Sequence, residues 1–115
     1  MKQFYAQGDI LLERVANATI TTPIAPDADG AVVLARGEVT GHRHAIYCNN
    51  VVMFRDDGLA RDIPAELYVG HVNVTGTASA ELRHEEHGPI TLMPGTYRVR
   101  RQREWTLAEP RVVAD

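Results

Sequence analysis

Apolar residues in this chain come in short runs or alternate with polar residues, and turn-forming residues separate the runs. The clearest alternation spans residues 67–74, where Val69 and His71 are expected on one face of a strand and Val72 and Val74 on the other. Nowhere does a 3.6-residue periodicity continue for three turns, so the pattern predicts no long helix. The chain is expected to be built from strands.

Other runs rich in apolar and β-branched residues predict further strands at residues 9–15, 31–35, 43–48, 51–55, 80–84, 90–93 and 96–105. Asn49-Asn50 is expected to close a two-residue hairpin between its flanking strands, because Asn tolerates positive φ. Pro94-Gly95 is a type II turn signal and indicates another hairpin. Closely spaced short strands predict an all-β fold, a small single-domain antiparallel β-barrel or sandwich.

One long segment, residues 16–30, interrupts this pattern. It contains Pro23 and Pro26 and ends with Asp29-Gly30, so it is predicted to lack regular structure. At about 15 residues it is longer than most connections. Two interpretations stay open, a surface loop of the single domain 1–115 and an arm that contacts another molecule.

The overall composition limits the classes of function. The 115 residues carry a net charge of −3 and are 44% hydrophobic, which is typical of one small globular domain with no general attraction to nucleic acid. Arginines 98, 100, 101 and 103 accompany Tyr97 and Trp105, but acidic residues flank them. A solvated strand paired with acidic neighbours is therefore preferred to a nucleic-acid surface.

Other features of the sequence predict where the protein resides. No apolar run approaches the ~20 residues of a membrane span, and residues 1–8 lack the apolar core of a signal peptide. A single cysteine, Cys48, excludes an internal disulfide and is interpreted as a small core residue. We therefore expect a cytoplasmic protein that does not contact membranes.

Four of the five histidines lie in two short segments, His42-Arg43-His44 and His84-Glu85-Glu86-His87. Two residues apart on a strand, the first pair would share a face with Cα atoms about 6.8 Å apart. The second pair would converge across a β-turn whose ends lie within about 7 Å, with Gly88 expected in the left-handed conformation that closes it.

Histidine is the commonest neutral metal ligand, so this pattern predicts a divalent metal site, zinc-like, formed by His42, His44, His84 and His87. Glu85 and Glu86 are candidate bases or oxygen ligands. The competing interpretation makes the histidines polar turn residues in solvent. His71, on an apolar strand face, is expected to be a packed histidine.

The patterns GEVTGHxH at 37–44, HEEHGPI at 84–90 and PGTYRV at 94–99 resemble small bacterial proteins of uncharacterised activity. A looser likeness is to the cupin β-barrels, whose first motif contains the His-x-His pair matched by His42 and His44. The cupin glutamate is replaced here by Cys48 or Asn49. That resemblance implies a metal-binding barrel in which a histidine of the 84–87 segment supplies a further ligand.

Two hypotheses of function follow. In the first, the metal site is structural if all four imidazoles bind, or hydrolytic if three bind and leave a position for water. In the second, the protein is a non-enzymatic, self-assembling or protein-binding β module, a homo-oligomer with the histidines at a subunit contact. The sequence names no small-molecule ligand and does not decide whether the protein is an enzyme.

Overall fold

The computed structural model describes residues 4–36, 41–105 and 110–112, with side chains for 4–36 and 41–102. Within these ranges the chain forms antiparallel sheets and two single-turn 3-10 helices, η1 (Asp57–Leu59) and η2 (Ala65–Leu67). The predicted all-β class is confirmed. No helix in the described part is long and apolar enough to cross a membrane.

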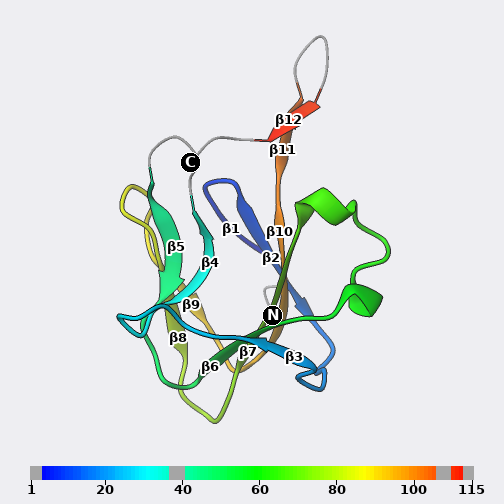
Figure 1. Cartoon of the computed structure of the whole chain (residues 1–115). Coiled ribbons are helices and arrows are strands. Elements are labelled where there is room, and N and C mark those ends of the chain that lie inside the picture. Colours follow the sequence, from blue (N-terminus) through cyan, green and yellow to red (C-terminus); the bar gives the residue numbers. More distant parts are fainter. Residues whose placement is uncertain (1–3, 37–40, 106–109, 113–115) are drawn as a thin grey trace.

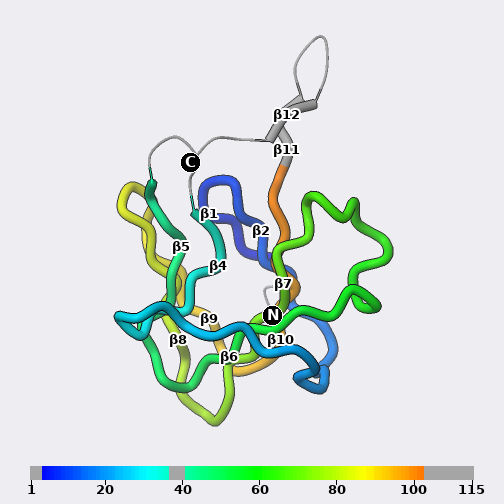
Figure 2. Tube along the Cα trace, in the orientation of Figure 1, coloured from blue at the N-terminus to red at the C-terminus, as the bar shows by residue number. Residues whose placement is uncertain are grey.

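Two main sheets make up the body of the protein (Figures 1 and 2). The larger sheet has the spatial order β1 (Phe4–Gln7), β2 (Ile10–Val15), β10 (Gly95–Arg101), β7 (Tyr68–Val74), β6 (Val51–Arg55) and β3 (Thr22–Ile24). The smaller sheet has the order β4 (Val32–Arg36), β5 (Arg43–Ile46), β8 (Ala80–Arg83) and β9 (Ile90–Leu92). A separate pair, β11 (Arg103–Trp105) and β12 (Pro110–Val112), follows β10.

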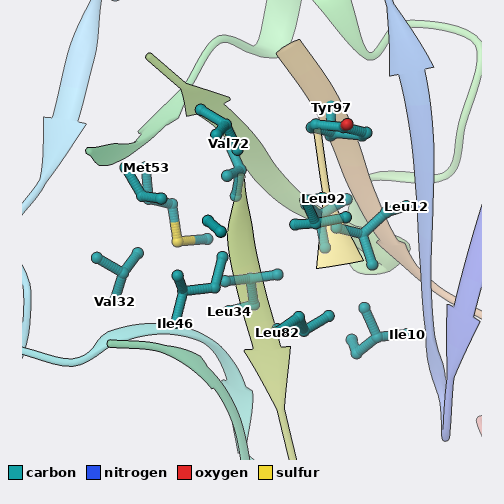
Figure 3. Packing of buried hydrophobic residues seen from close by; sticks show 14 of the residues in the cluster. Ile10, Leu12, Val32, Leu34, Ile46, Met53, Val72, Leu82, Leu92 and Tyr97 are labelled. Carbon is teal, nitrogen blue, oxygen red and sulfur yellow. The ribbon is translucent and has the colours of Figure 1, made fainter. Parts of the chain in front are cut away.

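The two main sheets share one apolar core, as expected for a sandwich. Leu12 and Tyr97 come from the larger sheet, Ile46 and Leu82 come from the smaller one, and all four are fully buried. Figure 3 shows these side chains gathered between the sheets. Burying each large apolar side chain contributes about 1.5–3 kcal/mol, so this shared core fixes the relative positions of the strands that carry the histidines.

Both predicted hairpins are wrong. The strands on either side of Asn49-Asn50 are β5 and β6, which belong to different sheets, and no non-glycine residue in the described part has positive φ. Pro94-Gly95 likewise joins β9 to β10 across the sandwich. Turn residues reveal where the chain changes direction, but they do not reveal whether the next strand pairs with the previous one or crosses to the other sheet.

Residues 16–30 are more ordered than the prolines suggested. Thr22–Ile24 form β3, which pairs with β6 at the edge of the larger sheet, and Pro23 stands opposite Phe54. Proline is compatible with an edge strand because its missing N–H is not needed on the side that faces solvent. The prediction that the whole segment lacks regular structure is therefore wrong.

Two other segments differ from the prediction. β1 was not predicted as a strand, and it pairs with β2 through a two-residue turn at Gly8-Asp9. The predicted strand 96–105 is divided at Gln102 into β10 and β11. On β10, Tyr97 and Val99 are buried while Arg98 and Arg100 are half-buried, as the alternation predicted.

A smaller apolar cluster, formed by Ala60, Ile63 and Tyr68, lies apart from the main core. Next to Tyr68, His71 is 1% exposed and its ring stacks on Phe54 at a centroid distance of 5.3 Å. The Tyr68 hydroxyl lies 2.6 Å from His71 Nδ1. The prediction that His71 is a packed histidine is confirmed.

Candidate functional site

The pairing of β5 with β8 brings the two histidine segments together. In this ladder Ala45 stands opposite Arg83. His44 precedes Ala45 and His84 follows Arg83, so the antiparallel register places the two histidines at the same end of the ladder. Antiparallel strand pairing therefore brings together two histidines that are forty residues apart in the sequence.

The four predicted histidines form one cluster around His84. The His84 ring centroid lies 4.4 Å from that of His44, 4.6 Å from that of His87 and 5.5 Å from that of His42. The rings of His44 and His87 are parallel within 9° at 6.5 Å. His44 is fully buried, His42 and His84 are half-buried and His87 is exposed. The histidine cluster is thus open on one side and closed around His44.

His44 is held by Gln7 of the first strand. The Gln7 amide nitrogen donates to the carbonyls of Leu82 at 3.1 Å and Gly88 at 2.9 Å, so its oxygen faces His44 Nδ1 at 2.8 Å. An amide oxygen can only accept, so Nδ1 of His44 carries a proton. This arrangement assigns Nε2 as the nitrogen with which His44 would bind a cation.

Asp9 lies on the Nε2 side of His44. Its Oδ1 is 3.3 Å from Nε2, and its Oδ2 accepts from the Arg101 guanidinium. Both the Asp9 and His44 side chains are almost completely buried. A buried carboxylate is stable only with charged or hydrogen-bonding partners, and here they come from two different sheets.

The turn after β8 is closed in a way that the sequence did not predict. His84 Nδ1 accepts the backbone N–H groups of Glu86 at 3.0 Å and His87 at 3.3 Å. Gly88 is not among the glycines with positive φ, so its predicted left-handed conformation is wrong. The His84 imidazole, and not a left-handed glycine, stabilises this turn by accepting its backbone N–H groups. Gly41, directly before His42, does have a left-handed φ of 73°.

The two candidate bases occupy different positions. Glu85 Oε1 accepts the backbone N–H of Arg43 at 2.9 Å, and this hydrogen bond is the main reason that the pKa of Glu85 lies below its usual value. Glu86 is mostly exposed, with Oε1 3.5 Å from Nδ1 of His42. Glu85 therefore ties the turn to β5, while the Glu86 carboxylate extends toward solvent.

Arg43 lies between His42 and His44 in the sequence, but its side chain points away from the histidine cluster. It holds the 16–30 segment in place. Its guanidinium donates to Asp29 at 2.6 Å, to Asp27 at 3.1 Å and to the Tyr47 hydroxyl at 3.0 Å. The bond to Asp29, followed by that to Tyr47, raises the pKa of Arg43, and Arg43 in turn lowers the pKa of Asp29. These contacts hold the end of that segment against β5.

Two open hollows reach His84 from solvent. One, about 270 Å³ in volume, is lined by Arg43, Tyr47, Arg83, His84 and Glu85. The other, about 380 Å³, is lined by Glu81, Arg83, His84 and Pro89. In the part of the chain that the structure describes, however, no three His, Cys, Asp or Glu side chains are arranged so that they could hold a metal ion as they stand.

The remaining sequence candidates have structural roles. Arg98 pairs with Glu13 and Asp62, both at 2.6 Å, which agrees with the expectation of a strand paired to acidic neighbours. Cys48 is half-buried and packs against the main core. Residues 37–40 of the glycine-rich motif and the side chain of Arg103 lie outside the described residues.

Gln7, Asp9 and Arg101 were not predicted as site residues. Gln7 and Asp9 flank Gly8 at the turn between β1 and β2, and both are buried. Polar residues beside a turn glycine are usually exposed, so nothing local marks these two as buried. Their burial comes from Arg101 and the 84–88 turn, which lie far along the chain.

One of the comparisons with known proteins identifies a family. A search of curated proteins and of solved structures found no match. Residues 6–102 match a family model described as "Domain of unknown function (DUF8820)". The match includes Gln7, both histidine segments and Arg101, and it covers most of the chain, which therefore belongs to the DUF8820 family.

Proposed function

We propose that the protein binds one divalent transition-metal ion, zinc-like in its ligands, where His42, His44, His84 and His87 meet. The observation that supports this most is the orientation of His44. Its Nδ1–H donates to the Gln7 amide oxygen, and its Nε2 lies on the opposite side of the ring, 3.3 Å from Asp9 Oδ1. Histidines that bind metals commonly donate their second N–H to an oxygen in this way.

Metal binding would require a local rearrangement at His84. Its Nε2 is shielded from solvent, but its Nδ1 accepts two backbone N–H groups in the present turn. A neutral imidazole that binds through Nε2 carries its proton on Nδ1, which would conflict with those donors. The proposal therefore includes a reshaping of the 84–87 turn when the ion enters.

Both chemical outcomes of the proposal use the same residues. With all four imidazoles bound, the ion would be closed off and structural. With three bound, a water molecule would occupy the open position, and its lowered pKa would suit hydrolysis. The hollows beside His84 supply a path for the ion or for a substrate, and Glu86 is the candidate base that extends toward solvent.

Metal titration tests the proposal. Protein stripped with a chelator and titrated with Zn²⁺ is expected to bind one ion per chain, and His44→Ala is expected to abolish that binding. His71→Gln is the matched control, because it removes a buried histidine outside the cluster and should leave the stoichiometry unchanged. Failure of the wild-type protein to bind, or equal binding by His44→Ala, would contradict the proposal.

The alternative of a self-assembling β module remains a prediction. The segment proposed as a contact arm already makes contacts within its own chain, through the β3–β6 pairing and the Arg43 ion pairs. Measuring the mass of the metal-free protein, with and without residues 16–30, separates a homo-oligomer held by this segment from a monomer. In either case we expect the protein in the cytoplasm, where Cys48 would stay reduced.

A further inference from the structure

We infer that Asp9 supplies an oxygen ligand to the histidine cluster, which makes the centre a mixed nitrogen–oxygen site. This inference rests on the proposed metal-binding function and specifies the donor set within it. Neither histidine segment contains Asp9, which is presented from the turn between β1 and β2. Only the folded structure shows that Asp9 lies beside His44.

The distance between the two donor atoms carries the inference. His44 Nε2 and Asp9 Oδ1 are 3.3 Å apart. Charge-assisted hydrogen bonds between such groups are usually about 2.7–2.9 Å long. Two ligands on one tetrahedral ion, each about 2.0–2.1 Å from the metal, are separated by about 3.3–3.4 Å. The observed separation of 3.3 Å equals the spacing expected for two ligands of one tetrahedral ion.

Asp9 is also held in place by groups other than the cluster. Its Oδ2 accepts from Arg101, and its backbone carbonyl accepts the N–H of Gln102 at 2.8 Å. Gly8, at the first position of the two-residue turn, has a φ of 56°, a conformation that favours glycine, and Asp9 after it is buried. The carboxylate therefore presents Oδ1 to His44 while Oδ2 remains with Arg101.

Gln7 and Arg101 then act as positioning residues. Gln7 fixes the orientation of His44, and Arg101 fixes that of Asp9. Residues that hydrogen-bond to metal ligands keep those ligands aligned, and mutating them typically changes metal affinity by about 10–100-fold. The resulting centre would combine imidazole with one carboxylate, so its metal preference would shift toward harder ions such as Mn²⁺ relative to a site built from imidazole alone.

Metal affinity and metal preference together test Asp9. Asp9→Asn keeps the shape of the side chain but removes the anionic oxygen. It is expected to weaken binding on the order of 100-fold for Mn²⁺ and about tenfold for Cu²⁺, because carboxylate matters more to the harder ion. A merely structural role would lower affinity for both ions by the same factor. Asp9→Glu retains the charge and should fall between wild type and Asp9→Asn.

Asp62→Asn is the matched control, since Asp62 is also an arginine-paired aspartate but lies with Arg98, away from the cluster. It should leave both affinities unchanged. Wild-type affinities for Mn²⁺ and Cu²⁺ in folded Asp9→Asn would overturn the inference while the loss in His44→Ala still upheld the proposed function. If the Asp9 variants do not fold, the ¹³C resonance of the Asp9 carboxyl group in the wild-type protein decides. It should shift when Zn²⁺ binds, and an unchanged resonance would overturn the inference.

Discussion

Two histidines of this protein are almost completely buried, but different groups surround them. His44 is fully buried and His71 is 1% exposed, and both lie on strands. Each has Nδ1 close to a side-chain oxygen, 2.8 Å from Gln7 for His44 and 2.6 Å from Tyr68 for His71. Beyond these bonds, His44 meets a carboxylate and other imidazoles, whereas His71 meets the ring of Phe54.

The direction of the Nδ1 hydrogen bond separates the two residues. Gln7 offers His44 an acceptor, so Nδ1 donates and Nε2 is directed at the Asp9 carboxylate. The Tyr68 hydroxyl, which accepts the N–H of Asp56 at 3.0 Å, can donate its proton to Nδ1 of a neutral His71. Burial, followed by the charge of Arg98, lowers the pKa of His71. Burial alone therefore does not indicate function, and the groups facing each nitrogen do.

The largest effect should appear when His44 and His84 are replaced together. With Zn²⁺ at about 100 times its dissociation constant, metal binding adds about 2.7 kcal/mol to the free energy of unfolding. His44→Ala and His84→Ala should each remove this metal-dependent part, and the double variant should remove no more of it than either single one. Chemical denaturation with Zn²⁺ and with a chelator measures the difference.

The pair His44 and His71 is the control for this experiment. Their contacts are made with different residues, so their stability losses should add within about 0.3–0.5 kcal/mol, whether or not Zn²⁺ is present. Additive metal-dependent losses for His44 and His84 would mean that the two rings do not share an ion. The burial of His44 would then have no functional meaning beyond that of His71.

Much of the fold follows from alternation along single strands. The pattern at residues 67–74 predicted β7, and the alternation on β10 predicted that Tyr97 is buried while Arg98 is not. What local patterns did not predict is which sheet a strand joins. Asn49-Asn50 and Pro94-Gly95 both mark crossings between sheets, because the shared core, rather than the turn, decides where the next strand packs.

The site shows the same limit. Two short motifs were enough to predict that histidines 42, 44, 84 and 87 form one cluster, and the β5–β8 pairing brings them together. Asp9 and Gln7 could not be predicted, because their burial depends on Arg101 and on the 84–88 turn. Residues that orient a site through long-range contacts leave no periodic signal in the sequence.

A smaller effect should distinguish His71 by its response to pH. Because burial lowers its pKa below the usual value of about 6.5, the unfolded chain binds a proton more readily than the folded one. The contribution of neutral His71 to stability is therefore complete above the unfolded pKa and is lost as pH falls from there toward the folded pKa. The slope can reach about 1.4 kcal/mol per pH unit.

Unfolding in a chelator between pH 8 and pH 5 at about half-unit steps would measure this slope. His71→Gln should flatten it, since an amide still accepts from Tyr68 but does not titrate. His87→Gln, which removes an exposed histidine, is the comparison variant. An identical slope in the wild type and in His71→Gln would show that His71 is not the residue whose protonation destabilises the fold.

The smallest expected effect concerns Glu85 and decides between its two possible roles. Its carboxylate accepts the N–H of Arg43, a bond that also lowers its pKa, so this tie is present above the unfolded pKa and is lost as pH falls through the lower folded pKa. Glu85→Ala should lower the free energy of unfolding by removing this acceptor, while Glu85→Gln keeps an acceptor oxygen and should cost little. Asp56→Ala, which removes a comparable bond to the N–H of Gly58 at 3.0 Å, is the control on the His71 side. If Glu85→Gln instead weakens Zn²⁺ binding as strongly as Glu85→Ala does, the negative charge of Glu85 contributes to metal binding. Glu85 would then be a second carboxylate at the metal site, besides Asp9.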